Sequence, residues 1–271
     1  MSLITISQSM GCGRITIPSL VAKALNLELY DDEKLRREAM KIGTRSEELK
    51  AFNEQAPGLF PRLISRKPEI YLDIMEAVLY GVAKLGQGVI LGHGSHVLLQ
   101  SFDCALHVNL YSSIASRIQN LINEHGMTRS AAEKLVEKSD SQIKGFLKYA
   151  FHVDWDDPSL YDLTINCTKL DEEAIVNMIL EGAKSPSIKE CSLQAADVME
   201  RLSLEKKMEA AIVKAGLNPA FLHVDVPVKG VVHIRGVLPN QETESLLRST
   251  VNSVSGISES QYDITLMRKD V

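Results

Sequence analysis

The chain has 271 residues, of which 45% are hydrophobic and 24% are charged, and its formal net charge is −5. This balance suits one or two globular domains with a sizeable core, and it argues against a nucleic-acid partner because the basic residues do not gather anywhere along the sequence. No apolar run approaches the roughly 20 residues of a membrane span, and no signal peptide is indicated, so we expect a cytoplasmic protein without a membrane partner.

The cysteines do not form a recognisable motif. Cys12, Cys104, Cys167 and Cys191 lie far apart, and no pair has the spacing of a zinc site or a redox motif. The sequence therefore predicts neither a metal site nor a disulfide. Cys104 and Cys167 lie in apolar runs and are expected to be small core residues.

Strands alternate with helices through the first two thirds of the chain. Five short apolar runs predict strands: Leu3–Ile6, Leu27–Tyr30, Gly88–Leu91, Ala105–Leu110 and Leu163–Asn166. Helical patterns lie between them: one with the stripe Leu20, Val21, Ala24 and Leu25, one over Pro68–Leu85, one capped by Ser112 or Ser113, one capped by Thr128 or Ser130, and one over Glu172–Gly182. This alternation predicts a three-layer α/β domain with a parallel sheet over residues 1–184.

A second, smaller domain is predicted after a linker. The stretch Ala183–Ser192 is polar and contains Pro186, as linkers often do. Residues 193–271 then predict a helix, two strands, a helix and a strand, which is an α+β module. The predicted elements are Ala195–Ala215, Phe221–Val226, Val231–Arg235, Asn240–Val251 and Tyr262–Met267.

The loop after the first strand has the shape of an anion site. In "SQSMGCGRIT", two glycines lie between a strand and a helix N-terminus, where backbone N–H groups and the helix dipole can hold phosphate. Arg14 stands near the lysine position of a phosphate loop, and Thr16 offers a hydroxyl one residue late for Mg²⁺. Ser7 and Ser9 are further donors. Such turns also occur without ligands, and that alternative carries about equal weight.

Longer stretches resemble the cytidylate kinase-like family, a branch of the P-loop nucleoside monophosphate kinases. They read "LITISQSMGCGR", "LELYDDEKL", "GVILGHGSHVLL", "ALHVNLYSSIASRI" and the segment that ends in "FHVDWDDPSLYDLTINCTKL". The resemblance covers about residues 1–184. It implies a P-loop kinase fold and phosphoryl transfer from ATP, with Mg²⁺, to a small nucleotide such as CMP, under a lid that excludes water.

The resemblance also implies roles for individual residues. The first loop would bind the donor phosphates through Ser7, Ser9, Gly11, Cys12, Gly13, Arg14 and Thr16. Thr16 would also bind Mg²⁺. The acceptor side is lined by Asp31, Gly92, His93 and Gly94. Catalytic cations are Arg14, Arg117, Lys144 and Lys148, the last two on the lid helix. Residues 43–67 belong to the acceptor-binding region.

Three positions depart from the family pattern, and each departure dilutes positive charge. Arg14 replaces a glycine, His93 replaces the arginine of "GRG", and the lid is poorer in arginine. Simpler interpretations remain for several residues. His93 is more readily a packed loop residue than a base, Arg117 is equally well a solvated charge, and Trp155 is more readily a structural anchor. Asp31 and Asp32 suit helix caps.

Residues 193–271 resemble a BON domain, a small αββαβ module. The stretch "VDVPVKGVVHIRGVLPNQETESLLRSTVNSVSGI" carries the resemblance. It implies a core that contains Val224, Val226, Val232, Ile234, Leu246, Val251 and Ile257. The resemblance implies ligand binding or regulation, and a sheet edge that allows pairing with a second copy as a homo-oligomer.

Two functions follow from these patterns. The first is a nucleotide kinase with a regulatory tail. The second is a degenerate kinase-like domain that binds nucleotide or acts as a regulatory protein without transferring phosphate. Fold alone does not choose between them, because function depends on the site.

Overall fold

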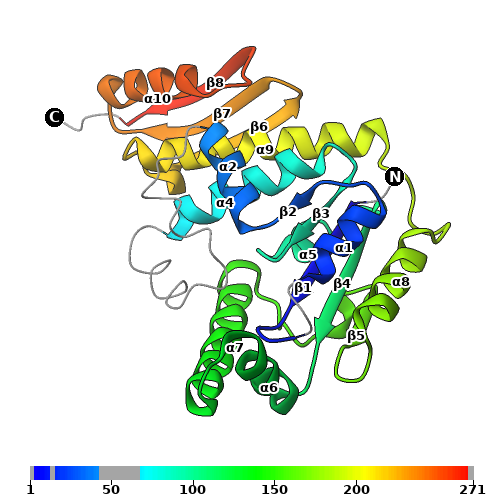
Figure 1. The fold of residues 1–271 in the computed structure, drawn as a ribbon. Helices are drawn as coiled ribbons and strands as arrows, with labels where there is room; N and C mark the ends of the chain where they lie inside the picture. Colours follow the sequence, from blue (N-terminus) through cyan, green and yellow to red (C-terminus); the bar gives the residue numbers. More distant parts are fainter. Residues whose placement is uncertain (1–2, 13–15, 43–67, 268–271) are drawn as a thin grey trace. The chain divides into compact units, whose positions relative to one another are not determined.

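The computed structural model describes residues 3–12, 16–42 and 68–267. The chain forms two compact units. Of the described residues, unit 1 contains 3–12, 16–36 and 85–192, and unit 2 contains 37–42, 68–84 and 193–267. Figure 1 labels the helices and strands of both units.

Unit 1 is built on a parallel sheet of five strands. They are β1 (Leu3–Gln8), β2 (Leu29–Tyr30), β3 (Gly88–Leu91), β4 (Ala105–Tyr111) and β5 (Leu163–Asn166), in the order β2-β3-β1-β4-β5. The predicted parallel α/β architecture is therefore confirmed. Because β1 is central and buried along most of its length, the loop that follows it opens at the carboxyl edge of the sheet, where ligands bind in such folds.

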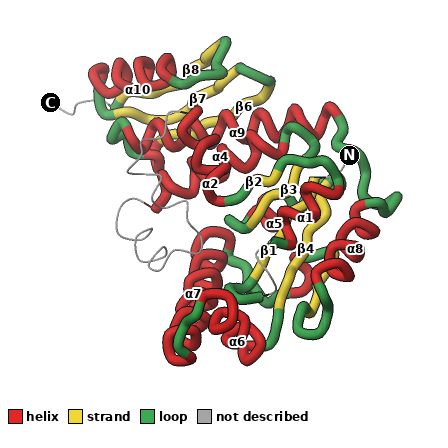
Figure 2. Tube along the Cα trace, in the orientation of Figure 1, coloured by secondary structure: helices red, strands yellow, loops and turns green. Residues whose placement is uncertain are grey.

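Unit 1 also contains helices, and two of them, Ile114–His125 and Arg129–Phe151, lie near the carboxyl end of β1 (Figure 2). The helices are α1 (Ile17–Ala24), α2 (Asp32–Lys41, which continues into unit 2), α5 (Ser95–Leu98), α6 (Ile114–His125), α7 (Arg129–Phe151) and α8 (Glu172–Ala183), with a 3₁₀ turn at Pro158–Leu160. Helices α1 and α8 pack against each other and against the sheet. Leu20 of the predicted stripe is exposed, because Val21 and Ala22 face the core instead.

Two helix caps are resolved in favour of one of the predicted alternatives. The Ser113 hydroxyl accepts a hydrogen bond from the N–H of Ser116 at 3.3 Å and caps α6. Thr128, not Ser130, caps α7, since its hydroxyl accepts from the N–H of Ala131 at 3.3 Å. These caps set the start of the two helices that flank the candidate site.

Unit 2 has the predicted order of elements. Helix α9 (Leu193–Lys214) is followed by β6 (Leu222–Val228), β7 (Val231–Leu238), α10 (Gln241–Ser253) and β8 (Glu259–Leu266), with a 3₁₀ turn at Pro219–Phe221. β7 pairs antiparallel with β6 and parallel with β8. Most of the predicted core is buried, but Leu246 is 43% exposed, and the adjacent Leu247 takes the inward position on α10.

Helix α4 (Pro68–Ala83) belongs to unit 2, although a division at the linker would place it with residues 1–184. It packs along α9, where the buried hydroxyl of Ser203 donates to the carbonyl of Ala77 at 2.7 Å. A serine in a helix contact allows close approach, and Gly81 lies at the same contact, with Ser203 Oγ 3.2 Å from the position of a Cβ. The second unit is therefore assembled from three separated parts of the chain.

A half-buried charge cluster between α4 and α9 makes unit 2 sensitive to pH. Lys206 lies 2.9 Å from Glu209, 3.2 Å from Glu76 and 3.8 Å from Asp73. Burial, followed by the nearby charge of Glu209, raises the pKa of Asp73 to about 7. The folded state thus holds this proton more tightly than the unfolded chain, so stability is full at low pH and falls as pH rises from about 4 to 7.

Asp73→Asn is therefore expected to stabilise the protein at pH 8, by about 1–3 kcal/mol, because it removes a buried charge that is costly there. At pH 4.5 the gain should be much smaller, because the carboxyl group is then neutral in the folded state and no buried charge remains to be removed. Urea unfolding at the two pH values measures the difference. Asp263→Asn on the exposed part of β8 is the control and should change neither value. An equal gain at both pH values would contradict the assignment.

The prediction that the chain contains no disulfide is wrong. Cys104 and Cys191 form a disulfide across 87 residues, while Cys12 and Cys167 are free and buried. Cys191 is thereby tied to the start of β4 within unit 1. Titration of the unfolded chain, purified without reductant, should give two thiols, and four after reduction. Four thiols before reduction would show that the bond does not form.

Among the described residues, no helix combines the length and the hydrophobicity that crossing a membrane requires.

Candidate active site

The loop after β1 forms a tight turn. The N–H of Cys12 donates to the carbonyl of Ser9 at 2.9 Å, and Gly11 has a φ of 74°. A Cβ on Gly11 would lie 2.7 Å from the carbonyl oxygen of Arg117. Glycine is therefore required here for two reasons: the left-handed backbone and the close approach of α6.

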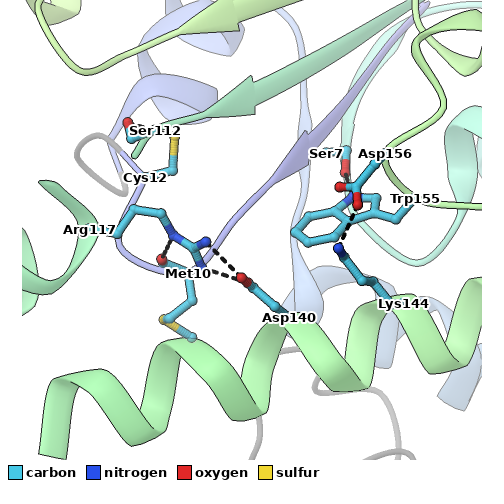
Figure 3. A network of polar contacts seen from close by, with 9 residues as sticks. All are labelled: Ser7, Met10, Cys12, Ser112, Arg117, Asp140, Lys144, Trp155 and Asp156. Carbon is cyan, nitrogen blue, oxygen red and sulfur yellow. Dashed lines mark hydrogen bonds and ion pairs between the residues drawn. The ribbon is translucent and has the colours of Figure 1, made fainter. Parts of the chain in front are cut away.

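Arg117 connects this loop to the long helix α7. Its Nε donates to the carbonyl of Met10 at 2.7 Å, and its two terminal nitrogens donate to the carboxylate of Asp140 at 2.8 and 2.6 Å (Figure 3). The arginine is only 4% exposed, so the alternative of a solvated surface charge is wrong. A planar guanidinium suits this bidentate contact. Position and orientation of the loop therefore depend on α7.

A second side chain from α6 holds the loop. The Asn120 amide donates to the carbonyl of Gly11 at 3.0 Å. With Arg117, this gives two consecutive loop carbonyls, those of Met10 and Gly11, a donor from the same helix. Both carbonyl oxygens therefore point toward α6. Their negative partial charge is turned away from an anion bound by the N–H groups of the loop.

The Cys12 side chain is buried beneath the loop. Its sulfur lies 3.3 Å from the hydroxyl of Ser112 at the end of β4. A hydrogen bond from Cys167 lowers the pKa of the Cys12 thiol, and Ser112 and the positive charge of Arg117 act in the same direction. The Cys12 side chain therefore points into the core, where its contact with Ser112 holds the loop against the end of β4.

Ser7 and Ser9 are both buried at the end of β1. The indole nitrogen of Trp155 donates to the hydroxyl of Ser7 at 3.2 Å (Figure 3), and Trp155 is itself 6% exposed. The interpretation of Trp155 as a structural anchor is therefore confirmed. It ties the "VDWDD" segment to the strand that leads into the loop.

Beside the loop lies a cavity of about 900 Å³. Its walls come from the start of α1, from α6, from the segment after β5 and from the start of α8, and the lining includes Thr16, Asn120, Cys167, Thr168 and Glu172. The hydroxyl of Thr16 donates to the carboxylate of Glu172. The cavity is of the size that small-molecule ligands occupy, and it adjoins the glycine turn.

The two predicted lid lysines point toward the acidic segment that follows α7. Lys144 pairs with Asp156, and Lys148 pairs with Asp154 at 3.1 Å. All four side chains are at least half exposed. Exposed ion pairs of this kind contribute only about 0–1 kcal/mol each, so either ammonium can leave its partner at little cost.

The "GHG" segment adopts a left-handed backbone throughout: φ is 69° at Gly92, 58° at His93 and 70° at Gly94. His93 is 1% exposed, and its Nε2 lies 2.7 Å from the carboxylate of Asp32. The interpretation of His93 as a packed, hydrogen-bonded loop residue is confirmed. Asp31 accepts from the N–H of Lys34 at 2.8 Å and caps α2, as one alternative proposed.

Several predicted residues lie outside the described part of the chain. They are Gly13 and Arg14 of the loop and the acceptor region at 43–67. Conversely, sequence reasoning missed Asp140 and Asn120. Asp140 lies 23 residues from Arg117 and on another helix, so no local pattern links the two, although an acidic residue on the inner face of a long helix is a signal that could have been noticed.

Comparisons with known proteins identify the family of most of this chain. The model of the cytidylate kinase-like family matches residues 3–169. A cytidylate kinase of Methanocaldococcus jannaschii is 26% identical over 181 residues, which cover 65% of this chain and 94% of that protein. One from Archaeoglobus fulgidus is 25% identical over 188 residues, covering 69% and 97%.

A solved structure of an uncharacterized protein from Eubacterium ventriosum superposes with a TM-score of 0.54 at 18% identity and covers 67% of this chain and 97% of that one. At this identity it supports the fold alone. The family match spans more than half of the chain and includes the loop after β1, Arg117 and helix α7. The chain therefore belongs to the cytidylate kinase-like family.

Proposed function

We propose that the protein transfers the terminal phosphoryl group of ATP to a small acceptor such as CMP. The observation that carries the proposal is the glycine turn at the carboxyl end of β1, which opens beside the 900 Å³ cavity in a chain of this kinase family. The loop Ser7–Thr16 would hold the donor phosphates, with Arg14 as the cation that the loop sequence supplies, and the cavity would take the rest of the donor nucleotide.

The donor set beside the loop fits Mg²⁺. Thr16 offers a hydroxyl oxygen and Glu172 a carboxylate oxygen, and the two are already in contact. Mg²⁺ prefers oxygen ligands and commonly takes only one or two carboxylates together with substrate phosphates. When bound, it would neutralise charge on the transferring phosphoryl group. Thr16 would hold the ion directly, and Glu172 would orient the hydroxyl.

The remaining cations would act from the lid. Lys144 and Lys148 can turn from their exposed aspartates to the phosphates, since those ion pairs contribute little. Arg117 would act mainly by fixing the loop, because its donors are already used by Met10 and Asp140. On the acceptor side, Asp31 and the Gly92–Gly94 segment would shape the pocket, with His93 holding Asp32 in place.

The occupied donors of Arg117 favour a second candidate, a nucleotide-binding protein that does not transfer phosphate. In both cases we propose a regulatory role for unit 2, whose αββαβ order agrees with the BON-like prediction. We place the protein in the cytoplasm because ATP is available there.

The experiment is an ADP-release assay with ATP, Mg²⁺ and a panel of nucleoside monophosphates that includes CMP. The expected result is acceptor-dependent ADP release, which Arg14→Gln lowers by about 10²–10³-fold, by analogy with other phosphate-stabilising arginines. Arg129→Gln, an exposed position at the far start of α7, is the matched control and should keep full activity. ATP binding without turnover for any acceptor would favour the second candidate, and the absence of both would overturn the proposal.

A further inference from the structure

Unit 2 contains a cavity of its own, of about 490 Å³. It lies among the end of α2, the middle of α4, the second half of α9 and the end of α10. Its lining residues are Lys41, Ile42, Ile74, Lys207, Ala210, Ala211, Lys214, Ala215, Thr250, Ser253, Val254 and Ser255. A cavity of this volume holds a small metabolite.

Among the residues that the structure describes, the lining carries three lysines and no acidic residue, although the whole chain has 35 acidic and 30 basic residues. Lys207 and Lys214 are seven residues apart on α9, so they share one face of that helix, two turns apart. Such a concentration of one sign of charge raises the local concentration of the opposite sign. The cavity is therefore suited to an anion.

Two of these lysines have a structural explanation. Lys41 and Lys214 lie in the last turns of α2 and α9, where cations offset the helix dipole. Lys41 also pairs with Glu38 at 2.8 Å. Lys207 lies two turns before the end of α9, so the dipole does not account for it.

Lys207 has no local counterion among the residues that the structure describes. It is half-buried, and no residue of the described chain forms a hydrogen bond or a close ion pair with its ammonium group. The favourable charge near it, Glu200, is already bound by Lys84 at 3.1 Å and Lys229 at 2.8 Å. Burial, followed by repulsion from Lys84, lowers the pKa of Lys207. A half-buried ammonium group without a paired carboxylate is stabilised when an anion binds to it.

The preceding residue makes the contrast clear. Lys206 is also half-buried, yet three carboxylates surround it, those of Asp73, Glu76 and Glu209. Its charge is therefore compensated within the protein. The two adjacent lysines therefore differ in their counterions. Lys206 faces the carboxylates between α4 and α9, whereas Lys207 lines the cavity and faces no carboxylate of the described residues.

The hydroxyl groups of the lining indicate what else the ligand carries. Thr250 donates its hydroxyl proton to the carbonyl of Leu246 at 2.8 Å, and Ser253 donates to the carbonyl of Thr250 at 2.7 Å. Their oxygens can therefore accept hydrogen bonds from a ligand but have no proton left to donate. A ligand with hydroxyl groups of its own matches them, and Ile74, Ala210 and Val254 provide apolar surface for its carbon skeleton.

We propose that this cavity binds a phosphate-bearing polyol, with the phosphate on Lys207 and the hydroxyls of the ligand on Thr250 and Ser253. A free sugar phosphate and the headgroup of an inositol lipid share this chemistry. The site is separate from the nucleotide site of the proposed function and does not depend on it.

Calorimetric titration of the full chain with glucose 6-phosphate tests the proposal. Binding is expected, and Lys207→Gln should weaken it at least tenfold, while Lys207→Arg, which keeps the charge, should retain it. Arg14→Gln is the control for anions held by the loop after β1 and should change the affinity less than twofold. Circular dichroism and thermal unfolding check that each variant folds.

Vesicles that contain phosphatidylinositol 4-phosphate provide the second arm, by co-sedimentation. Binding of vesicles but not of glucose 6-phosphate, lost in Lys207→Gln, would support the same site and identify the lipid headgroup as the source. Three results would overturn the proposal: no binding of either probe, binding that is unchanged in folded Lys207→Gln, or binding that Arg14→Gln abolishes.

Discussion

Asp140→Ala is expected to destabilise the protein by about 3–5 kcal/mol, because it leaves the buried guanidinium of Arg117 without its counterion. Arg117 is 4% exposed and gives both terminal nitrogens to Asp140. Chemical unfolding measures the loss. Activity should fall as well, since Arg117 also holds the carbonyl of Met10 in the loop after β1.

The matched control lies on the same helix. Glu133 pairs with Arg129 at 3.7 Å, but both side chains are at least half exposed, so Glu133→Ala should cost no more than about 0.5 kcal/mol. Combining Asp140→Ala with Arg117→Met should recover part of the stability, because the buried charge is then removed as well. A cost for Asp140→Ala as small as that of Glu133→Ala would mean that Arg117 finds water or another partner.

Gly94→Ala is expected to cost about 2–4 kcal/mol, from a left-handed backbone and an overlap with an aromatic ring. Its φ is 70°, and a Cβ would lie 2.3 Å from the ring of Phe151, the last residue of α7. The methyl group would therefore push the end of α7 away from the "GHG" segment. Unfolding by urea gives the stability, and near-ultraviolet circular dichroism, with Trp155 as the sole tryptophan, reports the local displacement.

Gly126→Ala separates the two contributions to this cost. Gly126 has a φ of 63°, but a Cβ there would meet no atom of the described residues within 4 Å beyond its own chain neighbours. Its substitution therefore carries only the backbone penalty, about 1 kcal/mol. If both variants lose the same stability, contact with Phe151 does not determine the position of α7.

The sheet of unit 1 could be predicted because its strands are short apolar runs bounded by turn residues. Gly88–Leu91 and Leu163–Asn166 have the predicted bounds, since a glycine or a change to polar residues marks their ends. The caps Ser113 and Thr128 follow from the same local chemistry. The pattern of strand, glycine turn and helix likewise indicates where the candidate site lies, because all three are local features of the sequence.

What the sequence could not predict depends on contacts between distant residues. The pairs Arg117–Asp140 and Cys104–Cys191 join separate elements, and no local spacing indicates them. The assignment of α4 to unit 2 depends on its packing with α9, which local sequence patterns do not reveal. Leu246 and Leu247 differ only in which of two adjacent apolar residues faces the core, and a rotation of about 100° on a helix decides it.

The most direct test of the nucleotide site is calorimetric titration of the full chain with ATP in the presence of Mg²⁺. The proposed site predicts saturable heat with a micromolar dissociation constant, displacement by ADP, and a much weaker signal in Arg14→Gln than in Arg129→Gln. The absence of heat and of any competition by ADP would contradict it, and would mean that the family fold is retained in this chain without its nucleotide site.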